Sequence, residues 1–160
     1  MTTTASYFKS QYQLVQNSRQ VLFEYCQTIS NDNFVNENSS FGRGGSIRNL
    51  LVHIANAYEF WIIKNALKKD IVPTAYASKS TLEDVKPLFD TIDLEVNNFI
   101  DQFKGTEFIK LEFDIYDTQR IITPFELYTH VITHEFHHKG QILSLSRHLG
   151  YTPVDTDVIR

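Results

Sequence analysis

Two histidines in the last third of the chain have the spacing of a metal-binding pair. His134 and His138 are four residues apart. In a helix each residue advances about 100° around the axis, so two residues four apart point within roughly 40° of each other. Two imidazoles one turn apart on one helix face can hold a single transition-metal ion. The pair is the first candidate site, and it requires a helix around it.

The flanking residues predict that helix. Thr123 is a good N-cap, Pro124 suits the first helical position, and Glu126 completes a capping box with Thr123. Gly150, followed by Pro153, predicts the end of the helix. Both histidines share one broad face of this helix with Leu127, Val131, Gln141, Ile142, Leu145 and Leu149.

The same helix carries three more histidines. His130 lies at the edge of the face that carries the pair, so the pattern leaves it open as a ligand or as a hydrogen-bond partner of one. His137 projects further round and His148 lies far along the axis, so neither is expected to bind metal. Gly140 within a helix costs about 1 kcal/mol relative to alanine, which predicts a close approach of another group to the backbone there.

Residues 134–138 also satisfy the zinc-peptidase pattern H-E-x-x-H, in which Glu135 would be the general base. The longer metzincin pattern fails, because Gln141 and Ser144 stand where its glycine and third histidine belong. Glu135 points roughly 100° away from His134 around the helix. We therefore expect Glu135 to bond to a neighbouring helix or to orient a ligand, and not to act as an indispensable base.

The composition indicates a single domain over residues 1–160, with 42% hydrophobic and 21% charged residues. No apolar run approaches the roughly 20 residues that span a bilayer, and the N-terminus lacks the features of a signal peptide. Cys26 is the only cysteine, so no internal disulfide can form and we expect a cytoplasmic protein. The formal charge of -4 argues against a nucleic-acid partner.

Hydrophobic periodicity predicts three further helices, at about residues 5–29, 46–69 and 80–103. Ser46 should cap the second of them, and Ser80 with Glu83 should form a capping box on the third.

Two residues on these helices have more than one interpretation. Cys26 lies on the apolar stripe of the first helix, where a small buried hydrophobe is favoured over a reactive thiol. His53 lies at the margin of the stripe of the second helix. Taken alone, the periodicity favours a half-buried histidine that is hydrogen-bonded to a neighbour.

The segments between the helices are shorter elements. Residues 30–45 are predicted to be a loop that Phe34 and Phe41 hold against the core. Residues 70–79 form a connection. Alternating apolar residues between 109 and 122 predict a β-hairpin that turns at residues 117–119 and packs on the helices by one face.

These elements predict an all-α protein, a four-helix bundle with a short β-hairpin before the last helix, and such bundles often hold metal between facing helices. A second apolar stripe runs along the last helix, on roughly the opposite side from the histidine pair: Phe125, Ile132, Phe136 and Leu143. A homodimer would bury this stripe, and so would packing between two neighbouring helices of one chain; both explanations stay open.

Three segments carry a family resemblance: residues 44–55, which include His53, residues 133–142, and the sequence Leu-Gly-Tyr-Thr-Pro that begins at Leu149. Together they resemble the DinB/YfiT-like superfamily over essentially the whole chain, although Lys139 stands where many members carry arginine. The resemblance implies a four-helix bundle with up-down-down-up connection that is often homodimeric. It also implies a divalent metal on three histidines, which correspond to His53, His134 and His138.

The resemblance further implies a function. Members with assigned activities are mostly thiol-dependent transferases that use bacillithiol, mycothiol or glutathione. We therefore expect a metal-dependent enzyme of this kind, with zinc or nickel on His53, His134 and His138, an open coordination position, a small-molecule substrate and a low-molecular-weight thiol such as bacillithiol. Two alternatives remain: a non-catalytic bundle with a structural metal, and a zinc peptidase that uses Glu135.

Overall fold

The computed structural model describes residues 4–39, 45–115 and 117–160, most of which are helical. The elements follow one another in this order: α1 (Thr4–Cys26), α2 (Asn31–Val35), α3 (Ile47–Tyr58), the π-helical segment η1 (Glu59–Ala66), the 3-10 turn η2 (Tyr76–Ser78), α4 (Leu82–Gln102), β1 (Leu111–Ile115), β2 (Thr118–Ile122) and α5 (Pro124–His148). None of the described helices combines the length and the apolar character needed to cross a membrane.

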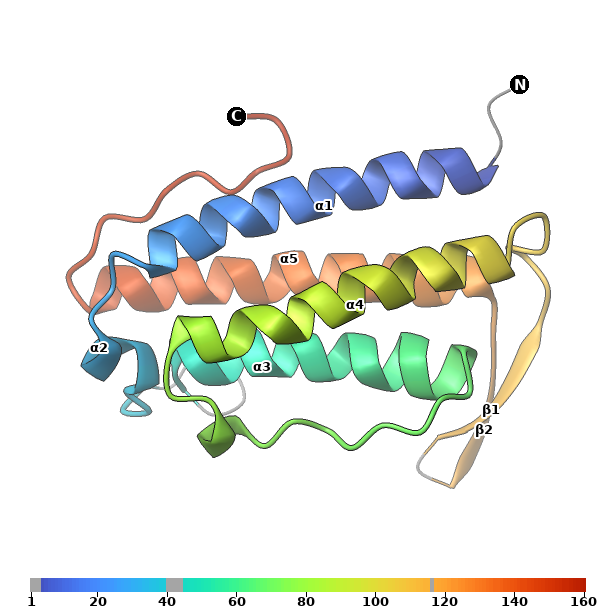
Figure 1. Cartoon of the computed structure of the whole chain (residues 1–160), viewed down its shortest axis with the longest axis horizontal. Helices are drawn as coiled ribbons and strands as arrows, with labels where there is room; N and C mark the ends of the chain where they lie inside the picture. Colours follow the sequence, from blue (N-terminus) through green and yellow to red (C-terminus); the bar gives the residue numbers. More distant parts are fainter. Residues whose placement is uncertain (1–3, 40–44, 116) are drawn as a thin grey trace.

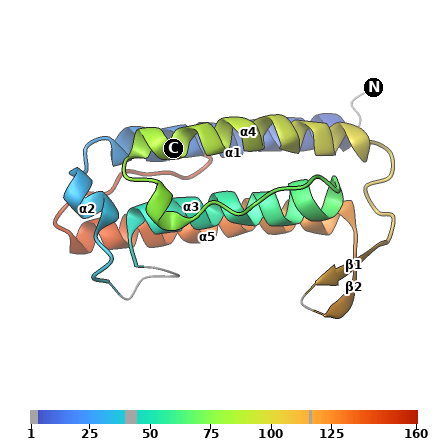
Figure 2. The ribbon, with the colours of Figure 1, turned by 60° about the horizontal axis from the view of Figure 1, so that its bottom comes forward.

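The long helices lie side by side in two layers. In Figures 1 and 2, α1 and α4 form one layer, and α3, with its continuation η1, lies beside α5 in the other. The chain runs in one direction along α1 and α5 and in the opposite direction along α3 and α4 (Figure 1). The hairpin β1–β2 extends from one end of this arrangement. The protein is therefore mostly helical with a short hairpin before the last helix, as predicted.

The cap of the last helix is the one that the sequence predicts. The Thr123 side chain accepts from the backbone N–H of Glu126, and the Glu126 carboxylate accepts from the backbone N–H of Thr123 at 2.7 Å. Pro124 occupies the first helical position, and α5 ends at His148, just before Gly150 with its left-handed φ of 92°. These caps fix where the helix that carries most of the histidines begins and ends.

The predicted capping box of Ser80 and Glu83 is wrong by one residue. Thr81 is the N-cap of α4, and Asp84 is its reciprocal partner. The sequence offers the same spacing in both registers, but Asp84 accepts from the backbone N–H groups of both Ser80 and Thr81, at 3.0 and 2.9 Å. One carboxylate thus satisfies two free donors at the start of the helix, which favours this register.

The segment predicted as a loop over residues 30–45 contains a short helix. Ser30 caps α2 by accepting from the backbone N–H of Asn33, a local contact that a composition rich in Asn and Ser does not reveal. Phe34 is 1% exposed, which confirms that it holds this segment against the core. Phe41, for which the same role was predicted, lies outside the described residues.

The predicted hairpin is present, but its turn lies earlier than expected. β1 pairs antiparallel with β2 in a register that sets Ile115 opposite Thr118, so Thr118 and Gln119 belong to the strand and not to the turn. Asp117 has the positive φ, 59°, that a tight hairpin connection requires. Phe113 and Ile115 of β1 are each 3% exposed, whereas Ile121 of β2 is 61% exposed. It is therefore mainly β1 that packs on the helical part.

Candidate metal centre

The structure brings three histidines from two helices together. His53 of α3 and the pair His134 and His138 of α5 each offer a ring nitrogen, and these nitrogens lie within 4.8 Å of one another. The ring centroids are 4.3 Å apart for His134 and His138, 4.6 Å for His53 and His138, and 5.0 Å for His53 and His134. The four-residue spacing places two of the rings, and the packing of α3 along α5 adds the third.

The chemistry of these three side chains suits a transition-metal ion. The Nε2 atom of His134 is buried and finds no hydrogen-bond partner among the residues that the structure describes. A buried polar atom without a partner is costly, and coordination would satisfy it. Burial, reinforced by the neighbouring histidines, lowers the pKa of His134 from 6.5 to about 3, so the ring is neutral near pH 7, as a metal ligand must be.

Gln141 fixes the orientation of one of the rings. Its Oε1 atom lies 2.7 Å from Nδ1 of His138, one turn further along α5. If Nδ1 of His138 carries the proton, it donates a hydrogen bond to Gln141, and the lone pair of Nε2 is available to coordinate a metal. Outer hydrogen-bond partners commonly orient ligating histidines in this way. The sequence placed Gln141 on the correct helix face but assigned it no role. A glutamine three residues after a candidate ligand was the available signal.

We expect Gln141→Ala to weaken metal binding by about 10–100-fold, because His138 would lose the partner that sets its tautomer and ring orientation. Competition with a chelator of known affinity measures the change. Gln141→Glu is the matched control: it keeps an acceptor facing Nδ1 and should retain most of the affinity. Unchanged affinity in Gln141→Ala would show that the contact does not tune the site.

The other histidines of α5 lie outside the group of three. The ring of His130 stacks on that of His134, with centroids 5.6 Å apart, and it also faces Trp61. This position makes His130 a neighbour of the cluster and not a member of it. His137 is exposed and contacts Gln141, and His148 pairs its Nδ1 atom with the backbone carbonyl of Ser144 at 2.9 Å.

Glu135 points away from the histidines into a buried network of charges. Its carboxylate accepts two hydrogen bonds from Arg19 of α1, both at 3.0 Å, and one from the Tyr58 hydroxyl of α3 at 2.7 Å. Lys139, one turn along α5, forms an ion pair with it at 3.1 Å. Glu135 is 0% exposed, so every contact it makes is with protein atoms of the interior. This geometry agrees with the expectation of a bond to neighbouring helices and separates Glu135 from the candidate metal position.

The network keeps Glu135 ionised. Burial alone would raise the pKa of this carboxyl, but the charges of Arg19 and Lys139, with the hydrogen bonds from Arg19 and Tyr58, hold it below its ordinary value. Arg19 also forms an ion pair with Asp93 of α4 at 2.7 Å. One network therefore joins all four long helices, and it is centred on the residue that follows His134.

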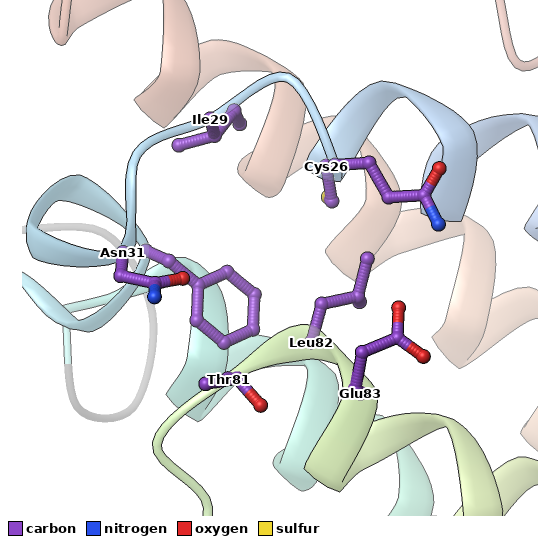
Figure 3. A pocket seen from close by; sticks show the side chains of 8 residues that line it. Cys26, Ile29, Asn31, Thr81, Leu82 and Glu83 are labelled. Carbon is purple, nitrogen blue, oxygen red and sulfur yellow. The ribbon is translucent and has the colours of Figure 1, made fainter.

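Two further predictions concern single residues of these helices. The expected close approach at Gly140 is wrong for the described part of the chain, because a Cβ atom built there would meet none of its atoms within 4 Å beyond the helix's own backbone. Nothing in the structure explains the glycine at this position. Cys26 is confirmed as a buried hydrophobe, 2% exposed, and burial raises the pKa of its thiol to about 12. It adjoins a cavity of about 280 Å³ that Leu82 and Thr81 of the α4 end also line (Figure 3).

The fold and the site together define the class of this protein: it is a helical protein with a candidate metal centre made of three histidines. The family model of the DinB family matches residues 1–160, and the chain belongs to the DinB family, which confirms the resemblance described above. The chain is also similar to the uncharacterized protein YizA of Bacillus subtilis (strain 168), with 28% identity over 144 residues that cover 86% of this chain and 84% of YizA.

The metal-free protein should lose stability as the pH falls below about 6.5. Because the pKa of His134 is about 3 in the folded state and has its ordinary value of 6.5 in the unfolded chain, the unfolded chain binds a proton in this range that the folded chain does not. Unfolding then takes up a proton and becomes more favourable as the pH falls. The melting temperature should decrease between about pH 7 and 4, and less steeply in His134→Ala. Equal slopes in the two proteins would contradict this linkage.

Proposed function

We propose that this protein is a metal-dependent enzyme of the thiol-dependent S-transferase kind. The observation that carries the proposal is the cluster of His53, His134 and His138, whose ring nitrogens from two helices lie within 4.8 Å of one another. Three protein ligands would leave a coordination position for a thiol or water, as in catalytic zinc sites. When bound there, the metal would supply Lewis-acid chemistry that lowers the pKa of that thiol or water.

The ligand set favours zinc or nickel. Imidazole nitrogens suit borderline transition metals, whereas magnesium and calcium prefer oxygen ligands. The three-nitrogen group of the described residues contains no carboxylate or thiolate, so the ion would keep its full positive charge. Gln141 holds His138 in a ligating orientation, and the lowered pKa values of His134 and His138 keep both rings neutral. No protein side chain is assigned as a general base.

Two alternative functions have different support. A peptidase would need Glu135 beside the metal, and the contacts of Glu135 with Arg19 and Tyr58 argue against that. A structural metal in a non-catalytic protein fits the same three histidines. A structural metal site can be distinguished from a catalytic one by adding thiols, because a metal without an open coordination position binds no thiol.

Cobalt(II) in place of the native metal provides the test. A thiolate that binds cobalt gives an intense charge-transfer absorption, so titration of the cobalt-loaded protein with small thiols reports an open position directly. We expect saturable absorption that disappears in His53→Ala. A loaded protein that gives no such band with any thiol would contradict the proposed thiol chemistry and favour a structural metal.

Architecture and location complete the proposal. We propose that the two helix layers are the four-helix bundle of the family, with up-down-down-up connection, as the chain directions in Figure 1 support. A reducing cytoplasmic location is supported by the single buried cysteine, Cys26. The substrate is proposed to be a small molecule, with no nucleic-acid or membrane partner.

We further propose a homodimer through α1 and α5. Of the second apolar stripe of α5, Ile132 is buried within the chain and Phe125 is 39% exposed, so the chain itself covers only part of it. An apolar groove of about 380 Å³ is lined by the two helices and by Val158 of the C-terminal segment, and Leu14 of α1 is 44% exposed there. An isologous contact would cover this groove twice. Light scattering should give the dimer mass at roughly tens of micromolar, and a monomer there would count against the proposal.

A further inference from the structure

A further cavity lies beside His130, the ring that neighbours the histidine cluster. It has a volume of about 370 Å³ and lies where η1, β2 and the first turns of α5 meet. Its walls come from Trp61, Arg120, Ile122, Glu126, Leu127 and His130. The rings of Trp61 and His130 are 5.2 Å apart, and His130 in turn stacks on His134, with centroids 5.6 Å apart. A single ring, His130, therefore connects this cavity to a member of the cluster.

The walls divide into an apolar part and a charged part. Trp61, Ile122 and Leu127 offer an aromatic face and two aliphatic side chains to the body of a ligand. The charged residues are Arg120 and Glu126, and they differ in whether their side chains already have hydrogen-bond partners. The Glu126 carboxylate accepts from the backbone N–H and the hydroxyl of Thr123, at 2.7 and 2.8 Å, so it serves the cap of α5.

The Arg120 side chain makes no such interaction with the described residues. It is exposed on β2, and no hydrogen bond or ion pair joins its guanidinium to any residue in the ranges that the structure describes. Among the described residues that line the cavity, it is the one cation. A guanidinium presents a planar pair of donors that matches a carboxylate, and it forms stronger hydrogen bonds to an anion than to a neutral group. The ligand that complements these walls has an apolar body and a carboxylate at one end.

We propose that this cavity binds the thiol of the metal centre, and that this thiol carries a carboxylate. The carboxylate lies on Arg120, the chain of the molecule packs on Trp61, and its sulfur reaches past His130 to the three-histidine cluster. The inference rests on the proposed function, because it names the class of thiol that the metal site takes. It makes Arg120, on the hairpin, the residue that determines specificity.

Paired probes of equal length test the inference. Mercaptocarboxylic acids of increasing chain length are compared with the mercaptoalcohols of the same length on the cobalt-loaded protein, with the charge-transfer band as readout. At the length that spans the cavity, we expect the acid to bind roughly tenfold more tightly than the alcohol. Arg120→Gln should abolish this preference and leave the affinity for the alcohol unchanged. Arg147→Gln removes the same charge from an exposed position near the far end of α5 and should preserve the preference.

Trp61 supplies a second readout that needs no metal. It is the only tryptophan of the chain, so its fluorescence reports occupancy of this cavity, and the acid should change it in the metal-free protein but not in metal-free Arg120→Gln. Equal affinities for acid and alcohol at every length, or an acid preference that survives Arg120→Gln, would overturn the inference and leave the thiol chemistry intact. A missing charge-transfer band with every thiol would instead overturn the proposed function, and this inference with it.

Discussion

Glu135→Ala is expected to lower the free energy of unfolding by roughly 3–5 kcal/mol, the usual effect of removing one partner from a buried ion pair. Glu135 is 0% exposed and accepts hydrogen bonds from Arg19 and Tyr58, while Lys139 pairs with it along α5. Without its carboxylate, two buried cations lose a counter-charge. Urea denaturation of the metal-free protein measures the difference directly.

Glu24→Ala is the control for this substitution. Glu24 is exposed on α1, and its carboxylate accepts from Gln20 one turn away at 3.0 Å, so its replacement should change stability by no more than about 0.5 kcal/mol. Glu135→Gln keeps the shape of the side chain and removes the charge. It should lower stability while the protein still takes up metal, because the carboxylate contacts α1 and α3 and not the histidine cluster. A variant of unchanged stability that lost a hydrolytic activity would favour the peptidase alternative.

The features that could be predicted from the sequence alone are clearest for α5. Its start, its end and the shared face of His134 and His138 depend on contacts within a few residues, and the structure confirms the cap that local spacing predicts. The misplaced cap at Ser80 and the missed helix α2 were also local, but there two hydrogen-bond registers or a short capped turn competed, and composition does not separate them.

Features that depend on packing between helices were beyond local spacing. His53 looked like a half-buried bystander on its own helix, and only the family resemblance proposed it as a third ligand. Its proximity to His134 and His138 arises from how α3 packs along α5, which the periodicity of neither helix encodes. The partners of Glu135 are likewise distant in sequence: Arg19 is 116 residues away and Tyr58 is 77.

The largest expected effect concerns metal content. Alanine at His53, His134 or His138 removes one of the three ligands. Loss of an outer hydrogen-bond partner of a ligand lowers metal affinity by about 10–100-fold, and loss of a ligand itself should lower it further. After dialysis, each of these variants should retain essentially no metal. His137→Ala and His148→Ala should retain it, because His137 is exposed outside the cluster and His148 bonds to the carbonyl of Ser144. His130→Ala should retain metal too, since its ring is a neighbour of His134 and not a member of the group.

The most direct test is the metal content of His53→Ala beside that of His148→Ala, both purified without an affinity tag and dialysed identically. His53 is the ligand whose assignment depends on helix packing, so it is the one on which the three-histidine centre depends. Circular dichroism on both proteins shows that they are folded. We predict that His148→Ala keeps a full complement of zinc or nickel and that His53→Ala keeps none. Full retention of metal in folded His53→Ala would contradict the three-histidine centre.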